Sequence, residues 1–426
     1  MLFSRIISPG LKKISEAYLA FLLELALRIK SFINPSAWPS ARRIESIHKG
    51  DLCSASGEVA VFASSYIETY PEFFLNLFEA LRVARIDLMI MSNRKIADEN
   101  VEILKKYCRW LVIRENIGRD FGAYADSLKA LQEEQIFPDR LYLFNDSLYY
   151  RSPKLLGPLL SDLRSGDFTC ATVSLTPILH AQSFCMSFSK KVLTHPFFCK
   201  YWAKYFHINT RRWAISKGEL GFSLMMRKAN FSPQPVFSSF QVARALLAAK
   251  KIGKLELIKI LPQYSTIHSI LSKYSVSSLV PNEKGTLRQF YIDISIFMRD
   301  IPSLIERTVS NIAQLSSYNK LPSGFALEAR KSDEVTDFNL TEDLLRELFS
   351  HSQIHSLGLL LWRHGEFPLM KRDIIFRSIY SPLQIDSIFE DDLSLFASTV
   401  KNDLIRRQEG RFLRGIQGFL FRRGFI

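Results

Sequence analysis

Between residues 58 and 144, short apolar segments alternate with longer segments of helical periodicity, and no other feature limits the fold as strongly. The short segments occupy residues 59–63, 87–91, 110–113 and 141–144. The segments with helical spacing occupy residues 71–83, 98–108 and 120–132. Strands that alternate with helices of about ten residues or more form βαβ units around a parallel sheet. The alternation therefore predicts an α/β fold, with Asp98 as the N-cap of the second helix.

Beyond Asp146 this rhythm changes. Two strand-like segments, at residues 168–174 and 183–188, have no crossover helix between them, so part of the sheet is predicted to be antiparallel. The predicted sheet is thus mixed but mostly parallel. The predicted regions are a basic helical segment at 1–50, an α/β domain at 51–240, a helical region at 241–330, a C-terminal helical segment at 338–400 and a basic tail at 401–426.

The chain of 426 residues is 47% hydrophobic and 23% charged, as is usual for folded proteins. This composition excludes disorder as the general description of the chain. The five cysteines are widely spaced and form no CxxC pair, which argues against a disulfide framework and against a zinc site. We therefore expect reduced thiols in a cytoplasmic protein.

The net charge of +14 is concentrated at the two ends of the chain. Residues 1–50 carry eight basic and three acidic side chains, and residues 401–426 carry seven and two. Only a small basic excess is left for the long middle. A nucleic-acid-binding domain more often spreads its basic residues over one folded face, so this distribution argues against nucleic acid as a partner.

The first 50 residues are predicted to contain a basic amphipathic helix. At about 100° per residue, its charged residues fall on one side: Lys12, Lys13, Glu16, Glu24, Arg28 and Lys30. Its apolar residues fall on the other side: Leu11, Ile14, Tyr18, Phe21, Leu22, Leu25 and Ile29. The tail at 401–426 repeats the pattern. Such a face binds either anionic lipid or the protein's own core, and amphipathicity alone does not separate the two.

Candidate ligand contacts follow the third and fourth strands, because ligands of open α/β sheets bind beyond the carboxyl ends of parallel strands. After the third strand, Asn116-Ile117-Gly118-Arg119-Asp120 opens a helix whose N–H groups suit an anion. A glycine there lets the backbone approach a ligand, although the same residue also serves ordinary packing. After the fourth strand, Asn145-Asp146-Ser147 offers oxygen ligands suited to Mg²⁺ or Mn²⁺, although such triplets also form simple turns.

Three polar residues further along the chain complete the candidate site. His180 and Gln182 begin a strand-like segment, and Glu219 stands between Gly218 and Gly221. Glu219 is interpreted either as a general base or as an acidic residue at a helix start, where the helix dipole favours it. His180 is either a ligand contact or a hydrogen-bonded structural residue.

The sequence resembles the rhamnan synthesis protein F family in five segments that follow one another in the same order along the chain. These segments are residues 59–63, 116–120, 145–147, 180–183 and 218–219. Members of that family are glycosyltransferase-like proteins of bacterial cell-surface polysaccharide and lipopolysaccharide synthesis. The resemblance covers residues 58–237, and a second family element is matched by His355, Trp362, Gly365, Pro368, Lys371 and Arg372. The sequence departs from the family at Tyr150, where Gly is usual, and at residues 352–354, where Ser-Gln-Ile replaces Asn-Pro-Thr.

The resemblance implies a GT-A-like nucleotide-sugar-binding domain. Asp146 would take the place of the acidic metal-binding motif, and Glu219 would deprotonate the acceptor hydroxyl. The donor would contact Asn116, Gly118, Arg119, Asp120, Asn145, Ser147, His180, Gln182, Lys371 and Arg372. Either a divalent cation or the two basic residues of the second element would stabilise the diphosphate leaving group. The alternative for those two residues is a solvated patch.

We therefore expect a bacterial glycosyltransferase that moves rhamnose or another 6-deoxyhexose from a nucleotide sugar to a lipid-linked polysaccharide, as in O-antigen synthesis. The basic ends lead us to expect it at the cytoplasmic face of the inner membrane, on an anionic surface. The alternative is a non-catalytic nucleotide-sugar-binding or scaffold protein of a polysaccharide synthesis complex. That alternative is suggested by the single acidic residue at the expected metal position.

Overall fold

The computed structural model describes most of residues 9–237 and short parts of the C-terminal third. The described residues are 9–54, 56–65, 70–174, 178–237, 358, 361–362, 367–372, 385–386, 389 and 394–406. Side chains of residues 9–17, 395 and 405–406 are outside this description. The helical region at 241–330, His355, Gly365, residues 352–354 and the tail from 407 lie outside the described residues, so the predictions made for them stay predictions.

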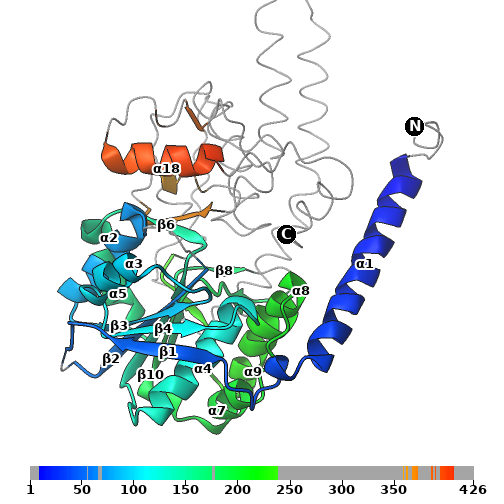
Figure 1. Ribbon diagram of the computed structural model, residues 1–426, viewed down its shortest axis with the longest axis horizontal. Helices are drawn as coiled ribbons and strands as arrows, with labels where there is room; N and C mark the ends of the chain where they lie inside the picture. Colours follow the sequence, from blue (N-terminus) through cyan, green and yellow to red (C-terminus); the bar gives the residue numbers. More distant parts are fainter. Residues whose placement is uncertain are drawn as a thin grey trace, which may run out of the picture.

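An eight-stranded sheet forms the centre of the structure (Figure 1). Its strands are β1 (Ile44–Lys49), β2 (Glu58–Ser64), β3 (Asp87–Ser92), β4 (Trp110–Arg114), β5 (Arg140–Asn145), β7 (Phe168–Cys170), β10 (Cys185–Ser189) and β11 (Gln234–Pro235). Their spatial order is β1-β4-β3-β2-β5-β10-β7-β11. The four strands β4, β3, β2 and β5 are parallel, and β10 is antiparallel to both of its neighbours. The predicted mixed, mostly parallel α/β fold is confirmed.

Helices cover both faces of the sheet (Figure 1). They are α2 (Glu72–Val83), α3 (Asp98–Lys105), α4 (Arg119–Glu133), α5 (Pro153–Leu163), α6 (Lys190–Leu193), α7 (Pro196–Ala203), α8 (Arg211–Trp213) and α9 (Phe222–Lys228). Successive side chains of a strand point to opposite faces, so β2 feeds two separate cores. Phe62 packs with α2, α3 and α5, whereas Val61 packs with α4, α7 and α9. Burial on both faces explains why these strands are continuously apolar.

A small second sheet brings a distant segment to the domain. Strand β12 (Leu369–Lys371) pairs antiparallel with β6 (Leu148–Tyr150), which directly follows Asp146 and Ser147. Helix α18 (Leu395–Arg406) contacts α2 through residues of the same core. A two-stranded hairpin, β8 (Val173–Ser174) with β9 (His180–Ala181), lies beside the main sheet.

The N-terminal region differs from the prediction of one helical segment at 1–50. Helix α1 (Pro9–Ile33) and the turn η2 (Pro35–Ala37) are followed by strand β1, which joins the edge of the sheet. The strand was missed because polar residues interrupt its apolar pattern. Every second side chain is half-buried and the others are exposed, as is usual for an edge strand.

The structure corrects one local prediction and agrees with another. Helix α3 ends at Lys105, and its N-cap is Ala97, so the prediction of Asp98 as N-cap was wrong. Asp98 is the first helical residue, where an acidic side chain still favours the helix dipole. All five cysteines are free thiols, as expected. Within the described residues, no helix is both long enough and apolar enough to cross a membrane.

Candidate functional site

The candidate site lies at the carboxyl ends of the parallel strands β2 and β5. The backbone N–H of Asp146 donates to the carbonyl oxygen of Ala63, 3.0 Å away, which continues the β2–β5 pairing by one residue. The Asp146 Oδ2 atom accepts from the Ser65 N–H at 2.7 Å and from Ser64 Oγ at 3.4 Å. The Oδ1 atom accepts no hydrogen bond from the described residues. Asp146 is therefore fixed in position while one carboxylate oxygen is left for a ligand.

Asn145 connects Asp146 and Ser147 to helix α4. The Asn145 amide donates from Nδ2 to Asp120 Oδ2 at 2.9 Å. Its Oδ1 atom accepts from both the backbone N–H and the hydroxyl of Ser147, at 3.1 and 2.5 Å. Because one amide holds all of these groups, the structure brings Asp120, Asn145 and Ser147 together.

The Asp120 carboxyl lies near three other charged groups. Burial raises its pKa, and the negative charge of Glu219 raises it further. The positive charges of Arg119 and Lys371 act in the opposite direction but do not cancel the rise. Two acidic and two basic side chains from α4, from residue 219 and from β12 therefore interact electrostatically at this edge.

Glu219 lies in the π-helix η3 (Ala214–Gly221), close to its end. The interpretation of Glu219 as a helix-start residue was therefore wrong. Its Oε1 atom accepts from the hydroxyl of Ser183 at 2.7 Å. The preceding Gly218 lets η3 approach α4, because a Cβ atom there would lie 2.6 Å from the ring of Phe121. π-Helical segments are rare and are often found at functional sites, and this one carries a carboxylate to the site.

Lys371 and Arg372 reach the site through the pairing of β12 with β6. Lys371 Nζ donates to Ser147 Oγ at 2.9 Å and lies 4.5 Å from the ring centre of Phe184. Arg372 is only 3% exposed; it donates to the carbonyl oxygen of Asp146 at 2.7 Å and pairs with Asp403 at 3.1 Å. Arg372 is not part of a solvated patch, and its role is to hold the backbone of Asp146.

The loop before α4 is shaped mainly by packing. Gly118 has φ of 81°, and a Cβ atom there would lie 2.8 Å from Cβ of His207. Packing against His207 thus explains the glycine without a ligand. Arg119 follows with φ of 56°, a conformation that costs a non-glycine residue about 1–2 kcal/mol. Asn116 is exposed, and its carbonyl oxygen accepts from Asn209 at 3.4 Å.

The hydrogen bonds that the structure gives His180 and Gln182 are local. His180 is buried, and its Nδ1 atom contacts the carbonyl oxygen of Ile178 at 2.7 Å. Its Nε2 atom lies 3.4 Å from Gln182 Nε2. Neither side chain is hydrogen-bonded to Asp120, Asp146 or Glu219. The contact from this segment to Glu219 comes instead from Ser183.

The described residues contain no group of three or more His, Cys, Asp or Glu side chains that could hold a metal ion. The Asp146 Oδ1 atom is one suitable oxygen, but Lys371 is hydrogen-bonded to the adjacent Ser147. Mg²⁺ needs six oxygen ligands in near-octahedral geometry. The described residues therefore do not fit a cation bound by the protein alone.

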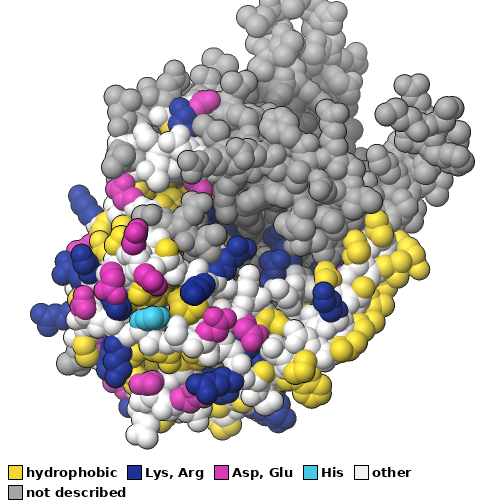
Figure 2. All heavy atoms as spheres, in the orientation of Figure 1, with side chains coloured by type: hydrophobic (Ala, Val, Ile, Leu, Met, Phe, Trp, Pro, Cys, Tyr) yellow, Lys and Arg dark blue, Asp and Glu magenta, His cyan; other side chains and the backbone are white. Residues whose placement is uncertain are grey.

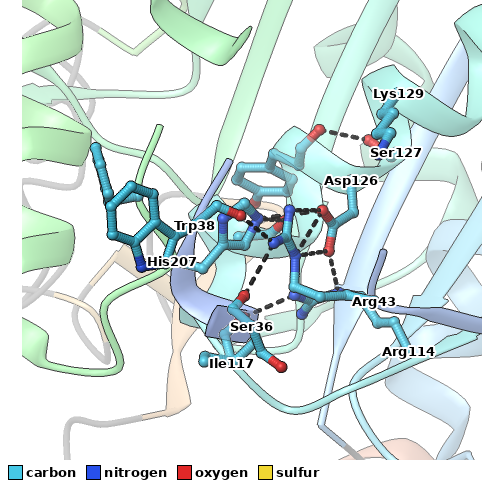
Figure 3. A network of polar contacts seen from close by, with 12 residues as sticks. Ser36, Trp38, Arg43, Arg114, Ile117, Asp126, Ser127, Lys129 and His207 are labelled. Atoms are coloured by element: carbon cyan, nitrogen blue, oxygen red, sulfur yellow. Dashed lines mark hydrogen bonds and ion pairs between the residues drawn. The ribbon is translucent and has the colours of Figure 1, made fainter. Parts of the chain in front are cut away.

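A buried ionic network holds helix α4, whose first residues are Arg119 and Asp120 (Figure 3). The carboxylate of Asp126 on α4 accepts from Arg43 at 2.7 Å, from Arg114 at 2.8 Å and from His207 Nε2 at 3.1 Å. All four side chains are at most 4% exposed. Although burial opposes ionisation, the hydrogen bonds from His207 and Arg43 and the nearby cations lower the pKa of Asp126.

Arg114 connects this network to the residues that follow the carboxyl ends of the strands. Its Nη2 atom donates to the carbonyl oxygen of Ile117 at 2.7 Å, and its Nη1 atom donates to Asn93 Oδ1. Asn93 in turn donates to Ser65 Oγ at 3.3 Å, and Ser65 holds Asp146. A continuous set of hydrogen bonds thus runs from the buried Asp126 to the candidate site. Ser65 and Asn93 were missed by sequence reasoning, although each directly follows a strand, where a search would have found them.

Comparisons with known proteins do not assign a family. No protein-family model matches the chain. The protein y4gN of Sinorhizobium fredii, described as uncharacterized, is 29% identical over 177 residues, which make up 40% of this chain and 46% of y4gN. The match thus spans about half the length of that relative.

Solved structures give weak overlaps. A protein described as a nucleotide-diphospho-sugar transferase, from Desulfovibrio desulfuricans, has a TM-score of 0.30 at 12% identity and covers 52% of this chain and 96% of that chain. One described as a glucose-1-phosphate thymidylyltransferase in complex with sucrose, from Bacillus anthracis, has a TM-score of 0.29 at 9% identity and covers 46% and 96%. These overlaps are too low to assign an activity.

The network predicts a large effect of Asp126→Asn on stability. The substitution removes the negative charge and leaves Arg43 and Arg114 buried without it, so we expect a loss of about 3–5 kcal/mol in the free energy of unfolding. Urea denaturation measures it. As a matched control, Asp139→Asn removes an exposed partner of Lys190 and should cost less than about 1 kcal/mol. Equal losses in the two variants would contradict the account.

The burial of His207 predicts that the free energy of unfolding depends on pH. Burial lowers its pKa, and the nearby arginines lower it further, although Asp126 acts against them. The unfolded chain takes up a proton near about pH 6.5, whereas the folded chain takes it up only at lower pH. Between these values the unfolded state binds more protons, so stability falls as pH falls.

The expected result is a smaller loss of stability between about pH 6.5 and 5 in His207→Gln than in the wild-type protein, measured by urea denaturation at several pH values. The control His48→Gln changes a partly exposed residue of β1 and should keep the wild-type slope. If stability falls with pH as steeply in His207→Gln as in the wild-type protein, His207 is not the cause of the pH dependence.

Proposed function

We propose that this chain is a glycosyltransferase that moves a sugar from a nucleotide-diphospho-sugar to a hydroxyl acceptor. The observation that carries the proposal is the convergence of Asp120, Asp146, Glu219 and Lys371 at the carboxyl ends of β2 and β5. In open α/β sheets, this edge is where ligands bind. The resemblance to the rhamnan synthesis protein F family supports the same reaction.

Lys371 is the group proposed to neutralise the diphosphate. A nucleoside diphosphate gains negative charge as it leaves, and a fixed cation stabilises that charge most in the transition state. Lys371 is positioned by Ser147 and lies beside a second cation, Arg372, that is already held by Asp403 and by the backbone of Asp146. A Mg²⁺ or Mn²⁺ ion remains a separate proposal, in which Asp146 Oδ1 is one ligand and the diphosphate and water supply the others.

Glu219 is proposed as the general base. The carboxylate would accept the proton of the acceptor hydroxyl while the acceptor oxygen forms a bond to the anomeric carbon of the sugar. The bond from that carbon to the diphosphate oxygen breaks, and its electron pair leaves with the nucleoside diphosphate. The hydrogen bond from Ser183 to Oε1 orients the carboxylate, and a positioned base of this kind contributes about 10²–10⁴-fold to the rate.

The donor and acceptor are proposed from the sequence resemblance. We propose a 6-deoxyhexose donor such as dTDP-rhamnose and a lipid-linked saccharide acceptor, in polysaccharide or O-antigen synthesis at the cytoplasmic membrane face. Tyr150, where the family usually has Gly, is buried in the core, and its hydroxyl donates to the carbonyl oxygen of Asn145 at 2.8 Å. The tyrosine thus supports the site residue beside it.

The second candidate is a nucleotide-sugar-binding or scaffold protein without catalysis. It is favoured by the single carboxylate at the expected metal position and by the lack of a metal-ligand cluster among the described residues. The two candidates make different predictions for turnover but the same prediction for binding of a nucleoside diphosphate.

Transfer assays with a panel of nucleotide sugars and lipid-linked saccharides, with and without a chelator, test the proposal. For Glu219→Gln we expect kcat to fall about 10²–10⁴-fold, with nucleoside diphosphate binding retained by calorimetry, because the amide keeps the shape but cannot accept the proton. The control Glu134→Gln changes a surface residue at the end of α4 and should leave kcat unchanged. Binding without transfer by the wild-type protein would favour the scaffold candidate.

Asp146→Ala provides a separate test of the strand-end carboxylate. The substitution removes the acceptor for the Ser65 N–H and any ligand role of Oδ1, so we expect transfer to be lost. Normal turnover by Asp146→Ala would overturn the role assigned to Asp146, whatever the result for Glu219.

A further inference from the structure

The described part of helix α1 is amphipathic, but its apolar side faces outward and not toward the protein. Its large apolar side chains face away from the protein and form what we call the apolar face of α1. This face consists of Tyr18, Leu19, Phe21, Leu22, Leu25, Ile29 and Ile33, which are 41–75% exposed. Phe32 is not part of it, because its ring packs against Phe206 and Trp213. Figure 2 shows the corresponding row of hydrophobic side chains along the outer side of the helix.

The opposite side of α1 is bound to the protein. Glu24 is 5% exposed and accepts from the hydroxyl of Thr210 at 2.6 Å and from Arg28 at 3.0 Å. The Arg28 guanidinium lies 5.7 Å from the ring centre of Trp213. Ala20 is also buried. These contacts fix the rotation of the helix, so the apolar face cannot turn inward without breaking the bonds of Glu24.

The apolar face is wide. At about 100° per residue, it spans an arc of roughly 160° from Phe21 to Leu19. A coiled-coil seam uses a narrower stripe of two residues in each heptad. A helix that lies in the headgroup layer of a membrane buries a broad face of this kind, with aromatic residues at the boundary.

Exposed basic side chains lie on α1 and on nearby segments of the domain. Lys30 on α1 and Arg42 before β1 are exposed. Lys217 on η3 lies 5.8 Å from the same Trp213 ring that Arg28 contacts, and Arg212 is exposed on the neighbouring helix α8. The one acidic residue among the described side chains of α1, Glu24, is buried and paired. The exposed charge of the described α1 side chains is therefore positive.

We propose that the apolar face of α1 binds the surface of an anionic lipid bilayer, with the helix lying in the headgroup layer. Buried apolar area and attraction to anionic headgroups are the two contributions that hold such helices. A second copy of the chain fits less well, because it would bring two sets of like charges together. This inference goes beyond the proposed sugar transfer, since lipid binding needs neither donor nor acceptor.

Flotation of the full chain with vesicles tests the proposal. One set of vesicles contains phosphatidylcholine only, and the other contains about one-third phosphatidylglycerol. We expect the wild-type chain to float with the anionic set. The double variant Leu22→Glu/Leu25→Glu should lower the partition coefficient by about tenfold or more, because charged side chains resist transfer into the apolar layer.

The matched control is Val83→Glu/Phe137→Glu, which changes two residues that are 68% and 73% exposed elsewhere on the surface. It should float like the wild-type chain. Equal flotation of the Leu22→Glu/Leu25→Glu variant and the wild type would overturn the proposal. Failure of the wild type to float, together with a dimer in light scattering that the same variant converts to a monomer, would also overturn it and identify a second copy as the occupant.

Discussion

The buried carboxylate of Asp126 is the interaction on which the arrangement of the candidate site depends. It accepts hydrogen bonds from Arg43, which precedes β1, and from Arg114, which ends β4. Burying these charges is unfavourable unless each is paired, so the edge strand, the central sheet and α4 must come together in one geometry. Arg114 then donates to the carbonyl oxygen of Ile117, just before α4 begins at Arg119. The charge pairing therefore helps to position the turn into α4, where Gly118 and Arg119 both have positive φ.

The site is assembled from segments that are far apart in the sequence. Asp146 follows the central strand β5, Glu219 comes from a π-helical turn, and Lys371 arrives on a strand that pairs with β6 more than 200 residues away in the chain. Each arrives through a contact of its own, such as the packing of Gly218 on Phe121. The result is a mixed cluster of acidic and basic groups, in which the pKa of Asp120 is raised by burial and by Glu219. Such perturbed groups gather at functional sites more often than elsewhere.

The sequence predicted the elements whose pattern is local and missed those that depend on partners. The alternation of apolar and helical segments placed β2 through β5 within a residue of their ends, because strands buried on both faces are continuously apolar. Strand β1 was missed because an edge strand needs less apolar sequence, and β12 was missed because three residues carry no periodicity. Asp146 and Asp120 could be found from their place after strands. The role of Gly118 could not, since its requirement comes from His207, a contact that only the tertiary structure reveals.

The central claim is that the cluster at the carboxyl ends of β2 and β5 binds a nucleoside diphosphate through Lys371. Titration calorimetry of the full chain with dTDP and UDP, comparing wild type with Lys371→Met, tests it most directly. Lys191→Met is the control, because Lys191 is exposed on α6, which follows β10 beside the amino end of β5, away from the candidate site. We expect binding in the wild type, an unchanged Kd in Lys191→Met and a Kd weakened by about tenfold or more in Lys371→Met. The same Kd in all three proteins, or no binding in the wild type, would contradict the account.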